Sequence, residues 1–445
     1  MTSLASFRTW AATLKGDVIL PVDSVYDAAR RVWNLDIDRR PALIVCCADE
    51  DDVVRAVDFA RTRGLIVAVR SGGHSQAGHS VCDGGMLIDL GRLKDADVDP
   101  RTRVARIGAG MRVGAMLDAT GAFGLATPTG ACPDVGIAGL TLGGGESLLM
   151  ARYGAVCDNL ISARVVTADG RIMTASADEN ADLYWAIRGG GGNFGIATAL
   201  YFTLHPLSRV LSGRLIFPVS RARDVMRRYR DLMASAPDEL QTSGGLVSSE
   251  NEPALFIAVC HCGDPESGNA LIHRWHASLR PESDNVKWIP YSADFLLPAV
   301  ASNGTGSFLL ELSDDVIDVL ADYFSSAPPS CTAAWNDYHG AVTRVLPDAM
   351  AFPLRHAGYD VFVHATWKTA ESRNDALTWL GELSEALRPW ERGVYVNNIG
   401  TESAEQTAAA YGANFERLTM IKAKYDPDNF FRLNHNVRPF DKSRT

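Results

Sequence analysis

The stretch Arg70-Ser71-Gly72-Gly73-His74-Ser75 follows the apolar run Leu65–Val69, and this succession decides the fold. A short, fully apolar run predicts a buried strand. Two successive glycines after it let backbone N–H groups crowd around an anion, so the loop is a candidate pyrophosphate cradle. It is not a Walker A loop, because no GK[ST] follows, and it is not a GxGxxG that opens a helix. Taken alone, a tight turn explains it equally well.

A second glycine-rich segment, residues 128–145, reads PTGACPDVGIAGLTLGGG. So many glycines in an otherwise apolar stretch indicate a backbone packed tightly against a flat or charged group. Cys132 lies between Gly130 and Pro133 on an expected loop. A free cysteine is more often a small core residue than a reactive one, so this segment alone does not decide its role.

Further motifs follow in a fixed order. They are GxCPxVGxxGxxLGGG at 130–145, YG at 153–154 with DNL at 158–160, RGGGGNFG at 188–195, and YDPDNFFRLNHN at 425–436. With RSGGHS, this set resembles the berberine-bridge-enzyme-like group of FAD-linked oxidases, which belongs to the vanillyl-alcohol-oxidase superfamily with its PCMH-type FAD-binding domain. Any one motif is weak evidence, whereas five in the right order are strong.

The resemblance implies a cofactor and its contacts. FAD would be bound covalently twice, through His74 to the flavin 8α-methyl group and through Cys132 to ring carbon six. Asn434 and Asn436 would lie near the flavin ring. The complete expected cofactor-binding set is Arg70, Ser71, Gly72, Gly73, His74, Ser75, Gly78, His79, Cys132, Val135, Gly136, Gly139, Leu142, Gly143, Gly144, Tyr153, Gly154, Asp158, Val165, Asn434 and Asn436.

Two covalent links have a physical rationale. They hold the ring in a roomy site that admits bulky substrates, and they typically raise its reduction potential, so the protein orients and tunes the cofactor. Val135 occupies a position that the family uses to control oxygen access. A small valine there favours an oxidase over a dehydrogenase.

The base that hydride transfer usually requires is the weakest part of the resemblance. Tyr395 and Asn397 match a family YxN segment and are the candidate catalytic residues, although a buried structural tyrosine is at least as good an explanation. Asn398 replaces a second tyrosine, which puts a two-tyrosine mechanism in doubt. Glu146-Ser147, after the triple glycine, is also unusual. This carboxylate would either face the cofactor or cap the next helix. Arg355, in AFPLR, resembles a family segment of the expected substrate region.

Composition sets the limits on class and partners. The 445 residues are 47% hydrophobic and 22% charged, which is ordinary for a soluble globular protein. A formal net charge of −10 disfavours nucleic acid or an anionic membrane as partner. The N-terminus lacks signal-peptide features, and no apolar run spans a bilayer, so we expect a cytoplasmic protein. The eight cysteines contain no CxxC pair, and no metal site is expected.

The expected fold class is α+β. A two-part FAD-binding domain of PCMH type, residues 1–205 and 396–445, would flank a substrate domain, residues 206–395, whose antiparallel sheet is covered by helices. Helices are predicted at 49–63, 111–120, 181–188, 221–235, 268–279, 313–325, 373–387 and 403–424. Strands are predicted at 65–69, 86–90, 104–108, 160–167, 171–175, 196–204, 211–219, 254–260 and 361–367.

The sequence therefore predicts an oxidase that passes hydride from a bulky organic molecule to FAD, with O2 as the second substrate. The molecule would be a sugar, a glycosylated natural product, an alkaloid or a polyketide. One alternative is a flavin-dependent dehydrogenase or oxidative cyclase. Another is a flavin-bearing binding protein that has lost turnover. The oligomeric state is not predicted.

Overall fold

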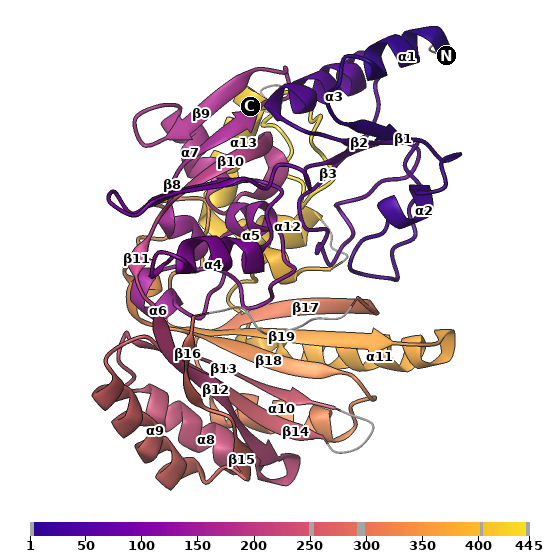
Figure 1. The fold of residues 1–445 in the computed structure, drawn as a ribbon. Coiled ribbons are helices and arrows are strands. Elements are labelled where there is room, and N and C mark those ends of the chain that lie inside the picture. The colour runs from indigo at the N-terminus through magenta and orange to yellow at the C-terminus, as the bar shows by residue number, and fades with distance from the viewer. Residues whose placement is uncertain (1–3, 249–252, 292–298, 401–403, 442–445) are drawn as a thin grey trace.

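The computed structural model describes residues 4–248, 253–291, 299–400 and 404–441 (Figure 1). Three sheets dominate it, with four, five and eight strands, and helices pack on or between them. The predicted α+β class is confirmed. The division of the chain at residues 205 and 395 stays a prediction.

The first sheet has the order β1-β2-β4-β3 and holds the strand that precedes the RSGGHS loop. Its central pairs are parallel. Helix α3 (Glu50–Thr62) begins where the Asp49 side chain accepts a hydrogen bond from the Asp52 N–H, as a good N-cap does. The strands are β1 (Asp17–Ile19), β2 (Leu43–Cys46), β3 (Val67–Arg70) and β4 (Met86–Asp89).

The second sheet is antiparallel, with the order β5-β6-β10-β8-β9. The strands predicted at 160–167 and 171–175 form an antiparallel pair, joined by a turn in which Gly170 adopts a φ of +80°. The strands are β5 (Ala96–Asp99), β6 (Val104–Gly108), β8 (Leu160–Val166), β9 (Ile172–Ser176) and β10 (Ile196–Thr203). Helices α4 (Val113–Gly121), α5 (Ile137–Leu142), α6 (Met150–Tyr153) and α7 (Ala181–Ile187) belong to the same half.

The third sheet is an antiparallel layer below the other two in Figure 1, and its far side carries four helices. Its six long strands are β12 (Arg209–Pro218), β13 (Leu240–Val247), β14 (Ala254–His261), β17 (Ala301–Leu309), β18 (Thr332–Tyr338) and β19 (Gly358–Trp367). The helices are α8 (Ala222–Met233), α9 (Pro265–Leu279), α10 (Asp314–Ser325) and α11 (Ala370–Leu387).

The two faces of this sheet differ because side chains alternate along a strand. On β14, Leu255 and Ile257 are fully buried in the core cluster that the helices share. Ala254, Phe256 and Ala258 point the other way and line a large cavity. One face is therefore core, and the opposite face is the floor of a site.

Strands β13, β17 and β18 were not predicted. Glycine, serine and asparagine are rare in strands, and they interrupt both β13 (LQTSGGLV) and β17 (ASNGTGSFL). Both segments therefore lack a clear strand signal in the sequence. Close packing explains the small residues: a Cβ on Gly244 would lie 2.1 Å from the Trp335 ring. Tertiary contacts thus override local strand propensity.

The single helix predicted at 403–424 is wrong. Residue 403 lies outside the described residues, and the rest forms α12 (Ala404–Tyr411) and α13 (Phe415–Tyr425). Gly412 adopts a φ of +51° between them, which ends the first helix. The break lets α13 turn against α7.

A buried lysine fastens the C-terminal segment to the glycine-rich half. Lys422 Nζ donates to the Asn193 carbonyl at 2.7 Å, to the Phe431 carbonyl at 2.9 Å and to Asp426 at 2.5 Å. Lys422 and Asp426 are fully buried. Asn193 Oδ1 also accepts from the Val437 N–H at 2.9 Å. The 191–193 turn and the chain after α13 are therefore one hydrogen-bonded unit.

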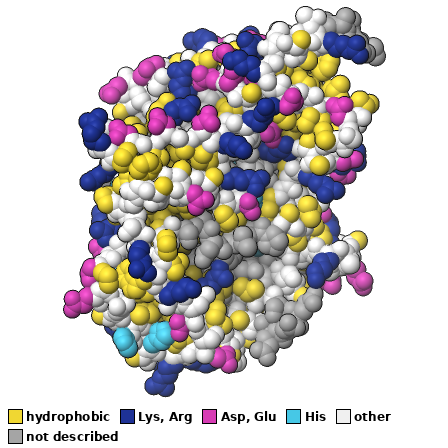
Figure 2. All heavy atoms as spheres, viewed as in Figure 1, with side chains coloured by type: hydrophobic (Ala, Val, Ile, Leu, Met, Phe, Trp, Pro, Cys, Tyr) yellow, Lys and Arg dark blue, Asp and Glu magenta, His cyan; other side chains and the backbone are white. Residues whose placement is uncertain are grey.

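The surface shows no single-sign field on the face drawn in Figure 2, where Lys and Arg side chains are interspersed with Asp and Glu. Among the helices of the described ranges, none combines the length and apolar character that crossing a bilayer requires.

Replacing Lys422 by methionine should lower the free energy of unfolding by about 3–5 kcal/mol, because a buried carboxylate loses its cation. Urea unfolding followed by circular dichroism measures this. Lys424→Met on the same helix is the matched control. Its ion pair with Asp182 is exposed, so the loss should be about 1 kcal/mol or less. Equal losses in the two variants would contradict a special role for Lys422.

Candidate functional site

A cavity of about 1180 Å³ lies between the glycine-rich half and the floor of the eight-stranded sheet. It exceeds the ~300–1,000 Å³ usual for a single small-molecule ligand, so a cofactor and a substrate can share it. Of the residues expected to contact FAD, the following line it: Ser71, Gly72, Gly73, His74, Ser75, His79, Cys132, Val135, Gly136, Gly139, Leu142 and Asn434.

The two glycine-rich segments touch backbone to backbone. A Cβ added to Gly72 would lie 2.2 Å from the Gly136 nitrogen, and one added to Gly136 would lie 2.2 Å from the Gly72 nitrogen. Ser71 Oγ also donates to the Ala109 carbonyl at 2.6 Å, which fixes the start of the loop. Only glycine fits at both positions, and the contact brings the two segments into one cavity.

His74 follows this contact and lies at the cavity wall. Its ring stacks on Trp33, with the ring centroids 5.4 Å apart and the planes 18° from parallel. Burial lowers its pKa to about 4, so the imidazole is neutral near pH 7. A neutral imidazole keeps one nitrogen lone pair, which is what a covalent bond from this side chain requires.

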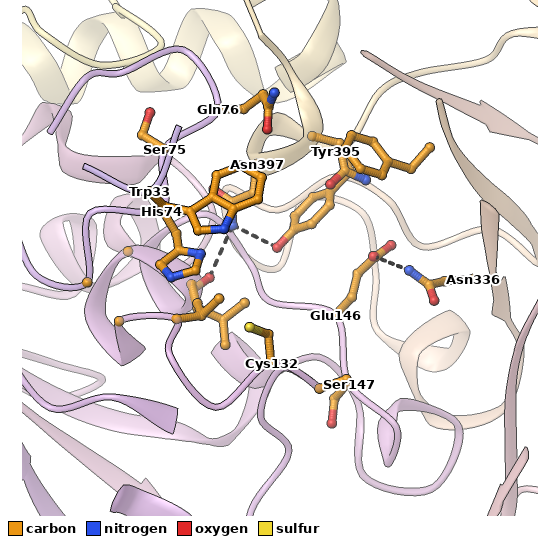
Figure 3. A pocket seen from close by; sticks show the side chains of 18 of the residues that line it. Trp33, His74, Ser75, Gln76, Cys132, Glu146, Ser147, Asn336, Tyr395 and Asn397 are labelled. Atoms are coloured by element: carbon orange, nitrogen blue, oxygen red, sulfur yellow. Dashed lines mark hydrogen bonds between the residues drawn. The ribbon is translucent and has the colours of Figure 1, made fainter. Parts of the chain in front are cut away.

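Cys132 reaches the same cavity from the second segment. Its thiol is free and its side chain is 5% exposed. Figure 3 shows Cys132 and His74 projecting from separate loops toward one space, with Tyr395 and Glu146 across it. Sequence reasoning placed both residues in one site only through resemblance, whereas the fold places them there by geometry.

The residues present fit FAD on the structure's own evidence. Asn434 Oδ1 and Asn436 Oδ1 are buried acceptors without a hydrogen-bond donor among the described residues, and His79 Nε2 is likewise unpartnered. Such groups are costly unless a ligand or water satisfies them. Asn434 and His79 line the cavity and, together with the glycine cradle, form the polar wall expected for a bound dinucleotide.

Four expected contacts lie behind the wall and support it. Arg70 pairs with Asp89 at 2.5 Å and donates to the Ala29 carbonyl, so it braces the loop. Gly78 forms a turn with a φ of +71°. A Cβ on Gly143 would collide with Asn397, and one on Gly144 with Phe352. These glycines permit close packing of the C-terminal segment. Asn436, which was also expected near the flavin ring, does not line the cavity.

The segment expected beside the nucleotide portion is held by contacts within the chain. Tyr153 stacks on His205 at 4.0 Å, and Gly154 turns with a φ of +80° against Asp158. Asp158 forms a bidentate pair with the fully buried Arg355 side chain, at 2.7 and 2.8 Å. Asp158 is thus paired with a cation of the chain, while the expected contact of this segment with the cofactor and the expected place of Arg355 in the substrate region stay predictions.

Val165 also lies outside the wall. Its side chain is buried on β8, and a Cβ on Gly195 would lie 2.5 Å from it. Gly195 itself lines the cavity. Val165 therefore supports the wall from behind, through a residue that the expected set did not include.

The candidate catalytic residues Tyr395 and Asn397 are joined at the cavity wall. Tyr395 Oη accepts from Asn397 Nδ2 at 2.7 Å, as Figure 3 shows. It also accepts from the Gly145 N–H at 3.0 Å. Burial raises the pKa of Tyr395 well above its usual value. The phenol is therefore protonated near neutral pH, and a phenolate base is disfavoured.

Glu146 faces the cavity and does not cap a helix, which resolves the two readings of Glu146-Ser147. Helix α6 begins at Met150, after Leu149. The Glu146 carboxyl lines the cavity and accepts from Tyr338 Oη at 2.7 Å and from Asn336 Nδ2 at 2.6 Å. Burial raises its pKa to about 7.

Asp360 is a site residue that sequence reasoning missed. It lies on β19, is fully buried, and accepts from Asn398 Nδ2 at 2.5 Å. It lies opposite Asn336 in the pairing of β18 with β19, and Asn336 donates to Glu146. Burial and the neighbouring Glu146 raise the pKa of Asp360 well above its usual range. The sequence signal for this position was indirect: Asn398 stands where the family resemblance predicts a second tyrosine.

Comparison with known proteins agrees with this geometry. The family model described as FAD binding domain matches residues 41–176, and the model described as Berberine and berberine like matches residues 394–438. The second match covers Tyr395, Asn397, Asn434 and Asn436. Both matched regions contribute residues to the cavity.

The chain is 32% identical to (R)-6-hydroxynicotine oxidase of Paenarthrobacter nicotinovorans, over 96% of this chain and 97% of that protein. The crystal structure of 6-hydroxy-D-nicotine oxidase from Arthrobacter nicotinovorans superposes with a TM-score of 0.88 at 28% identity, covering 96% of this chain and 98% of that one. Xylooligosaccharide oxidase from Myceliophthora thermophila C1 has the same fold, with a TM-score of 0.87 at 23% identity and coverage of 98% and 99%. The glycine contact, the polar wall and these likenesses agree that the chain belongs to the berberine bridge enzyme-like family of FAD-linked oxidoreductases.

Proposed function

We propose that this FAD-linked oxidoreductase is an oxidase whose FAD is bound covalently through both His74 and Cys132. The observation that carries the proposal is their convergence: a neutral imidazole and a free thiol reach one cavity from two loops that touch at Gly72 and Gly136. FAD, when bound, accepts hydride from a substrate carbon and returns the electrons to O2, which leaves as hydrogen peroxide.

The residues of the chain have separable tasks in this proposal. The loop Ser71–Ser75 and the segment Gly136–Leu142 hold the cofactor with backbone N–H groups and small side chains. Trp33, stacked on His74, fixes the orientation of the imidazole. Tyr395 and Asn397 form a hydrogen-bonded pair at the wall, and we assign them to orienting the substrate. Val135, which is small and lies at the wall, leaves a path for oxygen.

The substrate proposed is a fairly large organic molecule with an oxidisable C–H bond. The floor of the cavity offers Phe256 and Phe362 as apolar surfaces, with Ser243 and Asn336 as polar groups between them. Such a mixed floor suits a ring that carries a few hydroxyl or amine groups. The relatives named above oxidise a hydroxylated alkaloid and xylooligosaccharides, so these two chemistries are the first to test.

The covalent links predict a defined pattern of flavin release. Acid precipitation should leave the flavin on the wild-type protein, on Cys132→Ala through His74, and on His74→Ala through Cys132. The double variant should release it, because no covalent bond remains. Flavin absorbance in the pellet and in the supernatant measures the outcome.

Cys331→Ala is the matched cysteine control, since Cys331 is a fully buried core residue of the eight-stranded sheet. It should retain the flavin like the wild type. Complete release from the wild-type protein would refute covalent attachment, while a colourless protein would refute the proposed function as a whole.

An oxidase should also consume oxygen. We expect xylobiose, (R)-6-hydroxynicotine or a glycosylated natural product to bleach the flavin anaerobically, and air to restore its colour with release of hydrogen peroxide. An oxygen electrode and a peroxidase-coupled assay follow this reaction. Bleaching by substrate followed by slow recovery in air would favour a dehydrogenase or cyclase instead.

A further inference from the structure

Two carboxyl groups meet at the cavity wall opposite the covalent anchors. Glu146 comes from the loop after the triple glycine and Asp360 from β19. Asn336 donates to Glu146 and lies opposite Asp360 in the pairing of β18 with β19, so one residue brings the two carboxyls to the same place. Both are shielded from bulk water: Asp360 is fully buried, and Glu146 opens only partly, at the cavity wall. Two adjacent carboxyls in such surroundings cannot both ionise, so one keeps a proton.

Hydrogen bonding indicates which carboxyl keeps it. Asp360 Oδ2 accepts from Asn398, while Asp360 Oδ1 is buried with no donor among the described residues. Glu146 receives donors from Tyr338 and Asn336. Glu146 is thus the better-solvated site for a negative charge, and a proton on Asp360 can be donated to it.

The lone pairs of Glu146 leave room for one further proton. An ionised carboxylate offers about four acceptor positions. Tyr338, Asn336 and a protonated Asp360 occupy three of them. The fourth acceptor position of Glu146 stays open. Because Glu146 lines the cavity, a substrate hydroxyl or amine in the cavity can donate to it.

We propose that Glu146 is the catalytic base of this enzyme, and that Asp360, held protonated beside it, is a positioning residue that keeps Glu146 ionised and oriented. The inference rests on the proposed oxidase function and supplies the base that it lacks. Neither residue belongs to the Tyr395–Asn397 pair.

The proton and electron balance is simple. The substrate O–H or N–H bond breaks, its proton forms an O–H bond on Glu146, and its electron pair becomes the second bond of a C=O or C=N group. The C–H bond breaks with its electron pair, which FAD accepts as hydride. The substrate loses two electrons, and O2 takes them up with two protons, one of which Glu146 returns.

The pH dependence follows from the groups that face Glu146. These are Tyr338 and Asn336 on β18, Asp360 on β19 and Tyr395 before the C-terminal segment. No lysine or arginine of the described chain forms an ion pair with either carboxyl. Burial dominates and sets the Glu146 pKa near 7, so kcat/KM should rise as the pH passes upward through that value.

Glu146→Gln tests the base. The amide keeps the shape and cannot take the proton, so kcat should fall about a hundredfold or more. The KM of the panel compound that bleaches the flavin fastest should change by less than about threefold, and the rise of kcat/KM with pH should vanish. Glu239→Gln is the matched control, because Glu239 pairs with Arg152 outside the cavity wall. If Glu146→Gln raises KM and leaves kcat unchanged, Glu146 binds a substrate amine and is not the base.

Two substitutions of Asp360 test its protonation. Asp360→Asn mimics the protonated acid, with an amide N–H toward Glu146 and an oxygen toward Asn398, so the pH profile should be kept. Asp360→Ala removes the donor and should move the rise of kcat/KM to higher pH. A shift to lower pH in either variant would mean that Asp360 is charged. Inactive Asp360→Asn with active Glu146→Gln would make Asp360 the base.

Infrared difference spectra supply a readout that needs no turnover. When the pH of the flavin-bound wild-type protein is raised through 7, the carbonyl band of one protonated carboxylic acid should disappear, because Glu146 ionises. The Glu146→Gln variant should show no such pH-dependent loss. A second such band should persist at neutral pH and be missing from Asp360→Asn. Absence of both bands would refute the proposed roles of Glu146 and Asp360 and leave the oxidase function intact. A protein that carries no flavin would instead refute the proposed function.

Discussion

The close approach of two backbone segments at Gly72 and Gly136 is the constraint on which the site depends. A single methyl group at either position would lie 2.2 Å from the facing nitrogen. Because the segments touch there, His74 two residues later and Cys132 four residues earlier open into the same space. The cradle for the cofactor and both of its proposed anchors therefore follow from one contact that excludes every side chain.

The eight-stranded sheet provides the other half of the cavity by simple alternation. Leu255 and Ile257 bury one face of β14 under helices, and Phe256 faces the cavity between small neighbours. Glycine and serine lower the strand propensity of β13, yet Ser243 and Gly244 keep side-chain bulk out of the cavity that they line. Small residues make room for a substrate but lower the intrinsic strand propensity. Pairing with the neighbouring strands offsets that loss.

Two buried carboxylate environments in the same chain illustrate how partners determine function. Asp426 has a lysine and two backbone N–H groups as partners, so its charge is fully compensated and the pair serves to fasten the C-terminal segment. Glu146 and Asp360 have no cationic partner within the described ranges and compete for protons, which leaves one of them able to gain and lose a proton near neutral pH. The Lys422–Asp426 pair fixes the C-terminal segment, whereas the Glu146–Asp360 pair can exchange a proton with a substrate.

The sequence alone determined the cofactor half. Short-range signals such as the apolar run Leu65–Val69 and the ordered glycine motifs depend on neighbouring residues, and they identified the loops that carry His74 and Cys132. Only the tertiary structure decided the rest. It assigned Asp158 to Arg355, broke the last helix at Gly412, and brought Glu146 within reach of Asp360, 214 residues away. Such pairings depend on how distant strands align, which periodicity and motif spacing do not encode.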